Sequence, residues 1–152
     1  MSFGDGGIVV RPGEGKIIKV PGHSFTYKTM EEDTVGAYSL LEVFVTGGGS
    51  TQHIHKAEEE AFYVLDGEVN VKVGEQTIRG AAGTFVLIPR GTVHAIWNAG
   101  LTPAKFLVII SPAGLEQLWA EAGEETDPAI WIERVRSLGQ KYNIEVVGPP
   151  LG

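Results

Sequence analysis

Residues 47–67 of the chain read GGGSTQHIHKAEEEAFYVLDG, and this stretch holds two of the four histidines. His53 and His55 are separated by a single residue. On a helix, side chains two positions apart diverge by roughly 200°, whereas on a strand they share one face. The glycines at 47–49 oppose helix, and the neighbouring segments have the composition of strands. We therefore expect a strand that projects His53 and His55 to the same side.

A second predicted strand follows after a short polar turn and places Glu60 on the face that also carries Phe62 and Val64. A carboxylate on such an apolar face is costly to bury unless it is paired or bound to a metal. Two imidazoles on the neighbouring strand would make its burial tolerable. The preceding residues, Glu58 and Glu59, are expected to face solvent.

His94 is the third candidate ligand, because it shares the face of a predicted strand with the apolar Ile96. Three histidines and one glutamate offer three nitrogens and one oxygen. A six-coordinate metal such as Fe(II), Mn(II), Co(II) or Ni(II) would keep about two positions open on this set. Four protein ligands also suit structural zinc. The remaining histidine, His23, has no partner in sequence and is expected to be an ordinary hydrogen-bonded residue.

The composition excludes several other classes of site and partner. With 12 basic and 19 acidic residues, the formal charge is 12 − 19 = −7, which disfavours nucleic-acid binding. Cysteine is absent, so disulfides and thiolate metal sites are excluded. The first residues lack the pattern of a signal peptide, and no apolar run is long enough to cross a bilayer. A cytoplasmic protein without nucleic-acid or membrane partners is expected.

The rest of the 152 residues suggests one domain of short strands followed by helices. Seven segments rich in β-branched and aromatic residues predict an antiparallel sandwich or barrel; they are 16–20, 24–29, 38–45, 61–65, 68–73, 84–88 and 105–110. Asp66-Gly67 favours a type I′ hairpin between two of them. After Ser111 the pattern predicts two helices, over 112–125 and 127–142, with Asp127 and Pro128 opening the second.

Two longer motifs resemble those of the cupin superfamily. The first, G-x5-H-x-H-x(3,4)-E-x6-G, is matched by Gly47, His53, His55, Glu60 and Gly67. The second, G-x5-P-x-G-x2-H-x3-N, is matched by Gly83, Pro89, Gly91, His94 and Asn98. Segments such as RPGEG (11–15), EEDTVGAYSLLEV (31–43) and FLVIISPAGLEQL (106–118) further resemble bacterial quercetin 2,3-dioxygenase-like single-domain cupins.

This resemblance implies a mainly β, single-domain cupin jelly-roll barrel with C-terminal α-helices. Residues 1–110 would form the jelly roll, and residues 111–152 a helical extension and tail. One divalent transition metal would lie in the barrel mouth, bound by His53, His55, Glu60 and His94. Fe(II) is the first expectation, with Mn, Ni, Co, Cu or Zn as alternatives. Homodimers are common among such proteins, so a homodimer is expected.

Three functions follow as hypotheses. The first is a dioxygenase-type oxidoreductase that takes a small aromatic or enolisable substrate and dioxygen, with Glu60 as both ligand and catalytic base. The second is a non-redox cyclase or isomerase of a polyketide-like metabolite. The third is a small-molecule-binding protein with a structural metal. For an organic ligand the sequence suggests apolar pocket walls, formed by Phe25, Tyr27, Phe62, Ile96 and Phe106.

Overall fold

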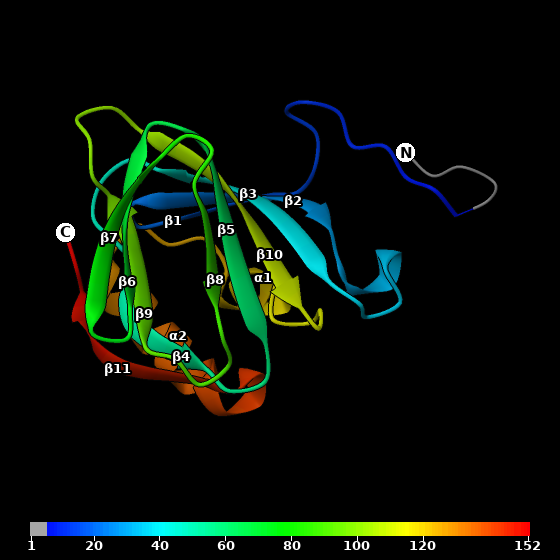
Figure 1. Cartoon of the computed structure of the whole chain (residues 1–152). Coiled ribbons are helices and arrows are strands. Elements are labelled where there is room, and N and C mark those ends of the chain that lie inside the picture. Colours follow the sequence, from blue (N-terminus) through cyan, green and yellow to red (C-terminus); the bar gives the residue numbers. More distant parts are fainter. Residues whose placement is uncertain (1–5) are drawn as a thin grey trace.

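The structure is a computed structural model that describes residues 6–152. Its β structure consists of two antiparallel sheets (Figure 1). The six-stranded sheet has the order β1 (Ile17–Val20), β2 (His23–Thr29), β3 (Ser39–Val45), β10 (Ala104–Ser111), β5 (Glu59–Asp66), β8 (Phe85–Ile88). The five-stranded sheet has the order β11 (Ile144–Pro150), β4 (Thr51–His55), β9 (His94–Asn98), β6 (Glu68–Val73), β7 (Gln76–Ala81). The predicted jelly-roll class is confirmed.

Alternate residues of the strands fill the core between the sheets. On β10, Phe106 and Val108 are buried, and they lie opposite Val43 and Leu41 of β3. The ring of Phe106 meets that of Phe62 on β5 edge to face, with centroids 5.5 Å apart. Such pairs add to the stability that burial of the rings already supplies. The alternation of apolar residues in the sequence therefore corresponds to the alternation of buried residues along the strands.

Two helices follow the last core strand, α1 (Gln117–Ala122) and α2 (Pro128–Tyr142). The first is shorter than predicted, because Gly114 (φ 125) and Gly123 (φ 77) have non-helical backbone on either side of it. The buried carboxylate of Glu116 accepts hydrogen bonds from the backbone N–H groups of Glu31 (2.7 Å) and Gly114 (2.6 Å). The second begins as predicted, since Asp127 accepts from the N–H of Ala129 at 2.9 Å. Neither these nor any other helix in residues 6–152 has the length and apolarity needed to cross a membrane.

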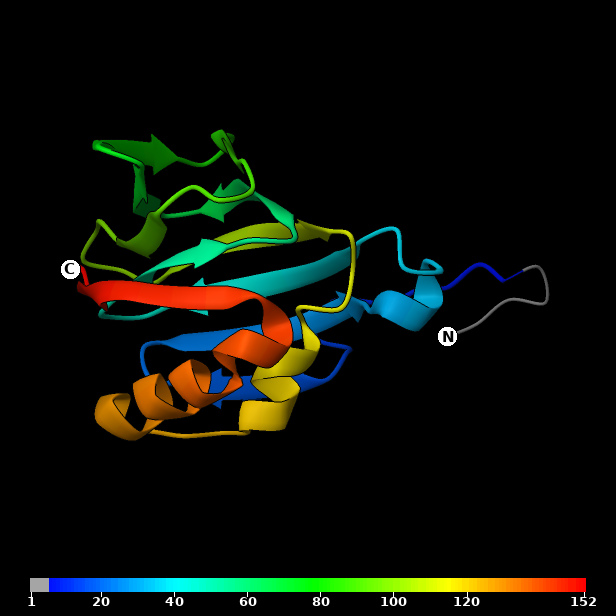
Figure 2. The same ribbon diagram turned by 90° about the horizontal axis from the view of Figure 1, so that it is seen from below.

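The C-terminal residues form the strand β11, which the sequence analysis did not predict. Ile144 lies opposite His55, and Val146 opposite His53. Gly139 allows the close return of the chain, because a Cβ there would lie 2.6 Å from the Ile144 carbonyl oxygen. Figure 2 shows α1 and α2 side by side, with β11 running back from α2 along its sheet. The tail thus becomes the neighbour of the strand that carries two candidate ligands.

The predicted hairpin at Asp66-Gly67 is wrong. β5 and β6 belong to different sheets, and the only described non-glycine residues with positive φ are Val35 and Asn143. A type I′ turn needs positive φ at both central residues. Here Gly67 alone has it (φ 72), and the chain turns a corner from one sheet into the other.

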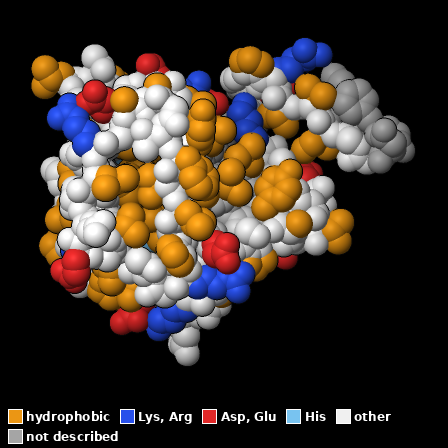
Figure 3. All heavy atoms as spheres, viewed as in Figure 1, with side chains coloured by type: hydrophobic (Ala, Val, Ile, Leu, Met, Phe, Trp, Pro, Cys, Tyr) orange, Lys and Arg blue, Asp and Glu red, His pale blue; other side chains and the backbone are white. Residues whose placement is uncertain are grey.

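The outer face of the six-stranded sheet exposes large hydrophobic side chains (Figure 3). They come from four adjacent strands: Phe44, Tyr63, Leu65, Phe85, Leu87 and Ile109. A contiguous apolar surface of this kind is typical of an interaction site. The homodimer expected from the resemblance stays a prediction.

The Gly67 corner generates a stability prediction. A Cβ at Gly67 would lie 3.0 Å from Ala104 Cα, whereas one at Gly74 (φ 59) would meet nothing within 4 Å. Gly74→Ala should lower the free energy of unfolding by about 1 kcal/mol, from left-handed backbone strain alone. Gly67→Ala should lower it by at least about 1 kcal/mol more, because the methyl group also overpacks the corner. Urea denaturation of both variants measures this, and equal losses would contradict the crowding.

Candidate metal centre and its pocket

Three histidines converge from neighbouring strands of one sheet. His53 and His55 lie on β4 with Ile54 between them, and His94 of β9 lies directly opposite His53. Glu60 approaches from β5, in the other sheet. The predicted ligand set is therefore brought together across the two layers of the fold.

The donor atoms of the four residues lie close together. Glu60 Oε2 is 2.9 Å from His94 Nε2 and 3.0 Å from His55 Nε2, and His53 Nε2 is 3.1 Å from His55 Nε2. One ligand atom from each residue falls within 4.8 Å of the others. Donor atoms that each lie about 2.0–2.2 Å from one metal ion are roughly 3 Å from one another, as these atoms are. The cluster can hold a metal ion.

Backbone carbonyls orient two of the imidazoles. His53 Nδ1 lies 2.5 Å from the Thr51 carbonyl oxygen, and His94 Nδ1 lies 2.9 Å from that of Thr92. Because a carbonyl oxygen only accepts, each Nδ1 carries a proton, so that in the neutral imidazole Nε2 has the lone pair that a metal needs. Such carbonyl contacts are usual behind metal-binding histidines. His55 Nδ1 is buried and makes no hydrogen bond within the described chain.

The ionisation of the cluster is coupled. Burial lowers the pKa of His53 well below its usual value, and the neighbouring imidazoles lower it further. Burial also acts to lower the pKa of His94, but the hydrogen bond and the charge of Glu60 outweigh this effect, and the pKa of His94 is raised. Burial acts to raise the pKa of Glu60, but the charges and hydrogen bonds of His55 and His94 outweigh this effect. The pKa of Glu60 is therefore well below its usual value. The pKa of Glu60 is thus not raised towards neutrality by its burial, and an ionised carboxylate suits a metal ligand.

Glu58 does not face solvent as predicted. It is only 8% exposed, its Oε2 is buried without a hydrogen bond in residues 6–152, and burial raises its pKa. The reason is the alternation of side chains along an extended chain. Glu58 precedes β5 and lies two residues before Glu60, so it points to the same inward side as Glu60. Glu59, on the opposite face, is exposed as expected.

A largely apolar pocket of about 120 Å³ adjoins the cluster. Four of the five predicted wall residues line it: Phe25, Phe62, Ile96 and Phe106. Tyr27, the fifth, is not among the lining residues. It is buried, and its hydroxyl donates to the Glu116 carbonyl oxygen, which holds it in the core beneath the start of α1.

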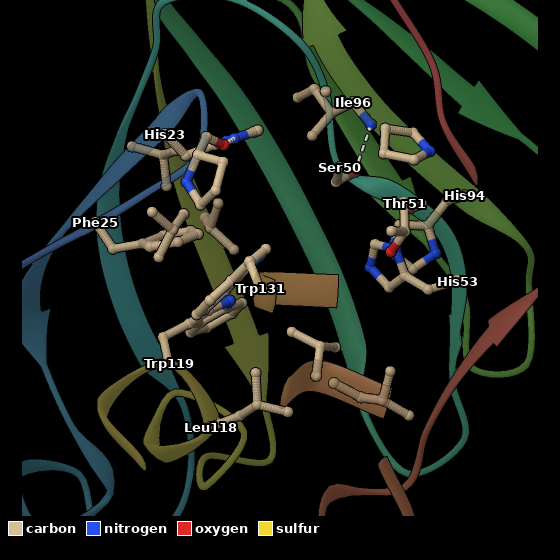
Figure 4. Close-up of a pocket in the computed structure, with 18 of the residues that line it drawn as sticks. His23, Phe25, Ser50, Thr51, His53, His94, Ile96, Leu118, Trp119 and Trp131 are labelled. Carbon is tan, nitrogen blue, oxygen red and sulfur yellow. Dashed lines mark hydrogen bonds between the residues drawn. The ribbon is translucent and has the colours of Figure 1, made fainter. Parts of the chain in front are cut away.

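Further residues line the pocket that the sequence analysis did not predict. Leu118 and Trp119 of α1 and Trp131 of α2 line it, together with His23 (Figure 4). The sequence feature that could have indicated these walls is the pair of tryptophans on amphipathic C-terminal segments. Their packing against the mouth of the barrel, however, depends on the tertiary fold. The helices thus complete the pocket and bring its aromatic side chains.

A family model described as the cupin domain matches residues 40–110, a range that includes all four candidate ligands. Residues 40–110 are therefore a cupin domain. The chain is 31% identical over 100 residues to the uncharacterized protein MJ1618 of Methanocaldococcus jannaschii, and the match covers 65% of this chain and 75% of that protein. The chain spans 12% and 60% of the lengths of two further curated relatives.

Solved structures share the cupin fold. A predicted oxalate decarboxylase from Thermotoga maritima has a TM-score of 0.65 at 22% identity, covering 69% of this chain and 99% of that one. The polyketide cyclase RemF from Streptomyces resistomycificus has a TM-score of 0.60 at 23% identity, covering 69% and 79%. At these identities the likeness shows the fold alone. The finer resemblance to quercetin 2,3-dioxygenase-like cupins stays a prediction.

Removal of one ligand tests the cluster. The protein reconstituted with Fe(II) or Mn(II) should retain about one metal ion per chain, and His94→Ala should retain well below half of that, because the loss of a ligand weakens binding. His23→Phe is the matched control, since it removes the one histidine outside the cluster, and it should retain metal as the unaltered chain does. Elemental mass spectrometry after dialysis measures the content, and equal loss in both variants would contradict the assignment.

Protons should compete with the metal. Histidine binds metal only when neutral, and the raised pKa of His94 means that its proton must be displaced near neutral pH. Metal affinity should therefore rise with pH through the neutral range and fall below about pH 6.5. Equilibrium dialysis between about pH 5 and pH 8 measures this. Unchanged occupancy at the acid end would exclude a site made of three histidines.

Proposed function

We propose that the protein is a metal-dependent oxygenase that acts on a small, neutral aromatic or enolisable molecule. His53, His55, Glu60 and His94 would hold one divalent transition metal, with Fe(II) as the first candidate. The observation that carries the proposal is the position of the four-donor cluster beside a closely fitting apolar pocket. This arrangement lets an organic molecule lie next to the metal while the walls exclude water.

The size and charge of the pocket narrow the substrate class. Its volume of about 120 Å³ is close to the roughly 150 Å³ of a protein cavity that holds one benzene ring. None of the described residues that line it is a lysine or arginine. A dicarboxylate or a sugar phosphate would find no basic side chain in these walls, and a flavonol exceeds a single ring. The pocket therefore favours a neutral, single-ring or similarly small enol substrate.

The side chains of the chain have distinct roles in this proposal. A bound metal would polarise a substrate oxygen as a Lewis acid and, if redox-active, would supply electrons to dioxygen. Glu60, which stays ionised, would accept the proton of a substrate hydroxyl group. All four ligands line the pocket, and His53 is the one among them that is only partly buried. Phe62 and Ile96, two residues from Glu60 and His94 on the same faces, would hold the substrate plane.

A non-redox cyclase or isomerase is the second candidate. The same donors and the same neutral pocket would serve Lewis-acid catalysis without consumption of oxygen, and RemF is a polyketide cyclase of this fold. In a third case, a small-molecule-binding protein, the metal would only stabilise the barrel. Oxygen consumption separates the first two functions, and turnover separates both from the third.

Oxygen uptake is therefore the test. Fe(II)-loaded protein should consume oxygen with single-ring phenols or small enols and more slowly with a flavonol, because the larger molecule does not fit. Glu60→Gln should lower turnover by about 100-fold or more, since it removes both the base and the carboxylate ligand of the metal, whereas Glu59→Gln, at the exposed neighbour, should leave turnover unchanged. Turnover without oxygen uptake would support the cyclase or isomerase, and a stabilised protein without any turnover would support the binding protein.

A further inference from the structure

His23 lies on the pocket wall that faces the metal cluster. It begins β2, opposite Val45, and shares the inward face of that strand with Phe25. The rings of His23 and Phe25 are nearly parallel (11°) with centroids 6.1 Å apart, and Phe25 stacks on Trp119 at 4.6 Å. Figure 4 shows this row of rings on one side and His53 and His94 on the other. A planar ligand between them would lie against the aromatic row.

The hydrogen bonding of His23 fixes which of its nitrogens can accept. Nδ1 lies 3.2 Å from the Pro21 carbonyl oxygen, so Nδ1–H donates to it. Burial lowers the pKa of His23, and the ring is therefore neutral near pH 7. It follows that Nε2 carries a lone pair and no proton. Nε2 is buried and has no hydrogen-bond partner within residues 6–152.

An unpaired acceptor is unusual in such a place. A buried acceptor left unsatisfied is destabilising, because the hydrogen bond that it loses to water is not replaced. Among the described polar side chains that line the pocket outside the cluster, Ser50 already accepts from the N–H of Ile96 at 3.0 Å. Among the described lining residues outside the metal cluster, His23 supplies the one buried side-chain nitrogen or oxygen that is without a hydrogen-bond partner. A ligand with a hydrogen-bond donor at this end of the pocket would satisfy it.

We infer that His23 Nε2 accepts a hydrogen bond from a hydroxyl or amino group of the substrate and so orients the ring in front of the metal cluster. This inference rests on the proposed function and deepens it. The substrate is then a single ring with one oxygen group on the metal side and a second, donor group on the side remote from the metal, such as a 1,4-dihydroxybenzene. Phenol is the simplest probe of the remote contact. A methyl ether or an unsubstituted ring would leave Nε2 unpaired and bind less tightly. His23 is thus a specificity-determining residue.

Binding of matched rings tests the inference without turnover. In protein loaded with redox-inert zinc, calorimetry should show phenol binding about five- to tenfold more tightly than benzene, the value of one hydrogen bond. His23→Phe keeps an aromatic ring in the row but removes the acceptor. It should bind benzene about as the unaltered chain does and lose the preference for phenol. His23→Gln, whose amide oxygen accepts, should restore part of the preference.

A second readout reports on the nitrogen itself. With the other three histidines bound to zinc, ¹⁵N-histidine spectra should show the His23 Nε2 signal as that of an unprotonated nitrogen, shifted upfield by phenol and little affected by benzene.

The outcomes separate this inference from the proposed function. If both rings bind and His23→Phe keeps the preference for phenol, the inference is overturned while the metal-dependent oxygenase stands on its own tests. If neither ring binds to the zinc-loaded chain, the inference is also overturned. Metal content and oxygen uptake then decide separately whether the proposed function survives.

Discussion

The charge of one buried carboxylate, Glu60, is the constraint on which the site depends. It is 6% exposed and comes from one sheet, and the imidazoles that compensate it come from the other. Removing one partner of a buried ionic cluster leaves an uncompensated charge, which is strongly destabilising. Glu60 therefore links the two layers of the barrel by charge as well as by packing. A bound metal would replace the proton shared near His94 and Glu60 and strengthen the same link.

The remainder of the fold surrounds this cluster with apolar material. β11 adds a strand beside β4, and the two helices carry tryptophans to the barrel mouth. The pocket is therefore small, neutral in its walls and aromatic on one side. A low-dielectric surround of this kind strengthens the interactions between ligand, carboxylate and imidazoles. The proposal of a small neutral ring as the substrate rests on the same property.

Much of the fold and the cluster could be predicted because both follow from the alternation of strands. The period of two along strands and the spacing of two motifs were enough to predict the four ligands, His53, His55, Glu60 and His94. What failed depended on tertiary contacts. Asp66-Gly67 looks like a hairpin locally, yet its strands pair with others, and β11 is a strand only because β4 offers an open edge. Tyr27 shares the predicted inward face, but the carbonyl of Glu116 draws its hydroxyl away from the pocket.

The central claim is that one metal is held jointly by both sheets. Crystals of the reconstituted protein, with data collected at the absorption edge of the metal, test it most directly. The account predicts a single anomalous peak at about 2.0–2.2 Å from Nε2 of His53, His55 and His94 and from a carboxylate oxygen of Glu60. A peak bound by surface carboxylates, or one that leaves Glu60 outside the ligand set, would contradict it.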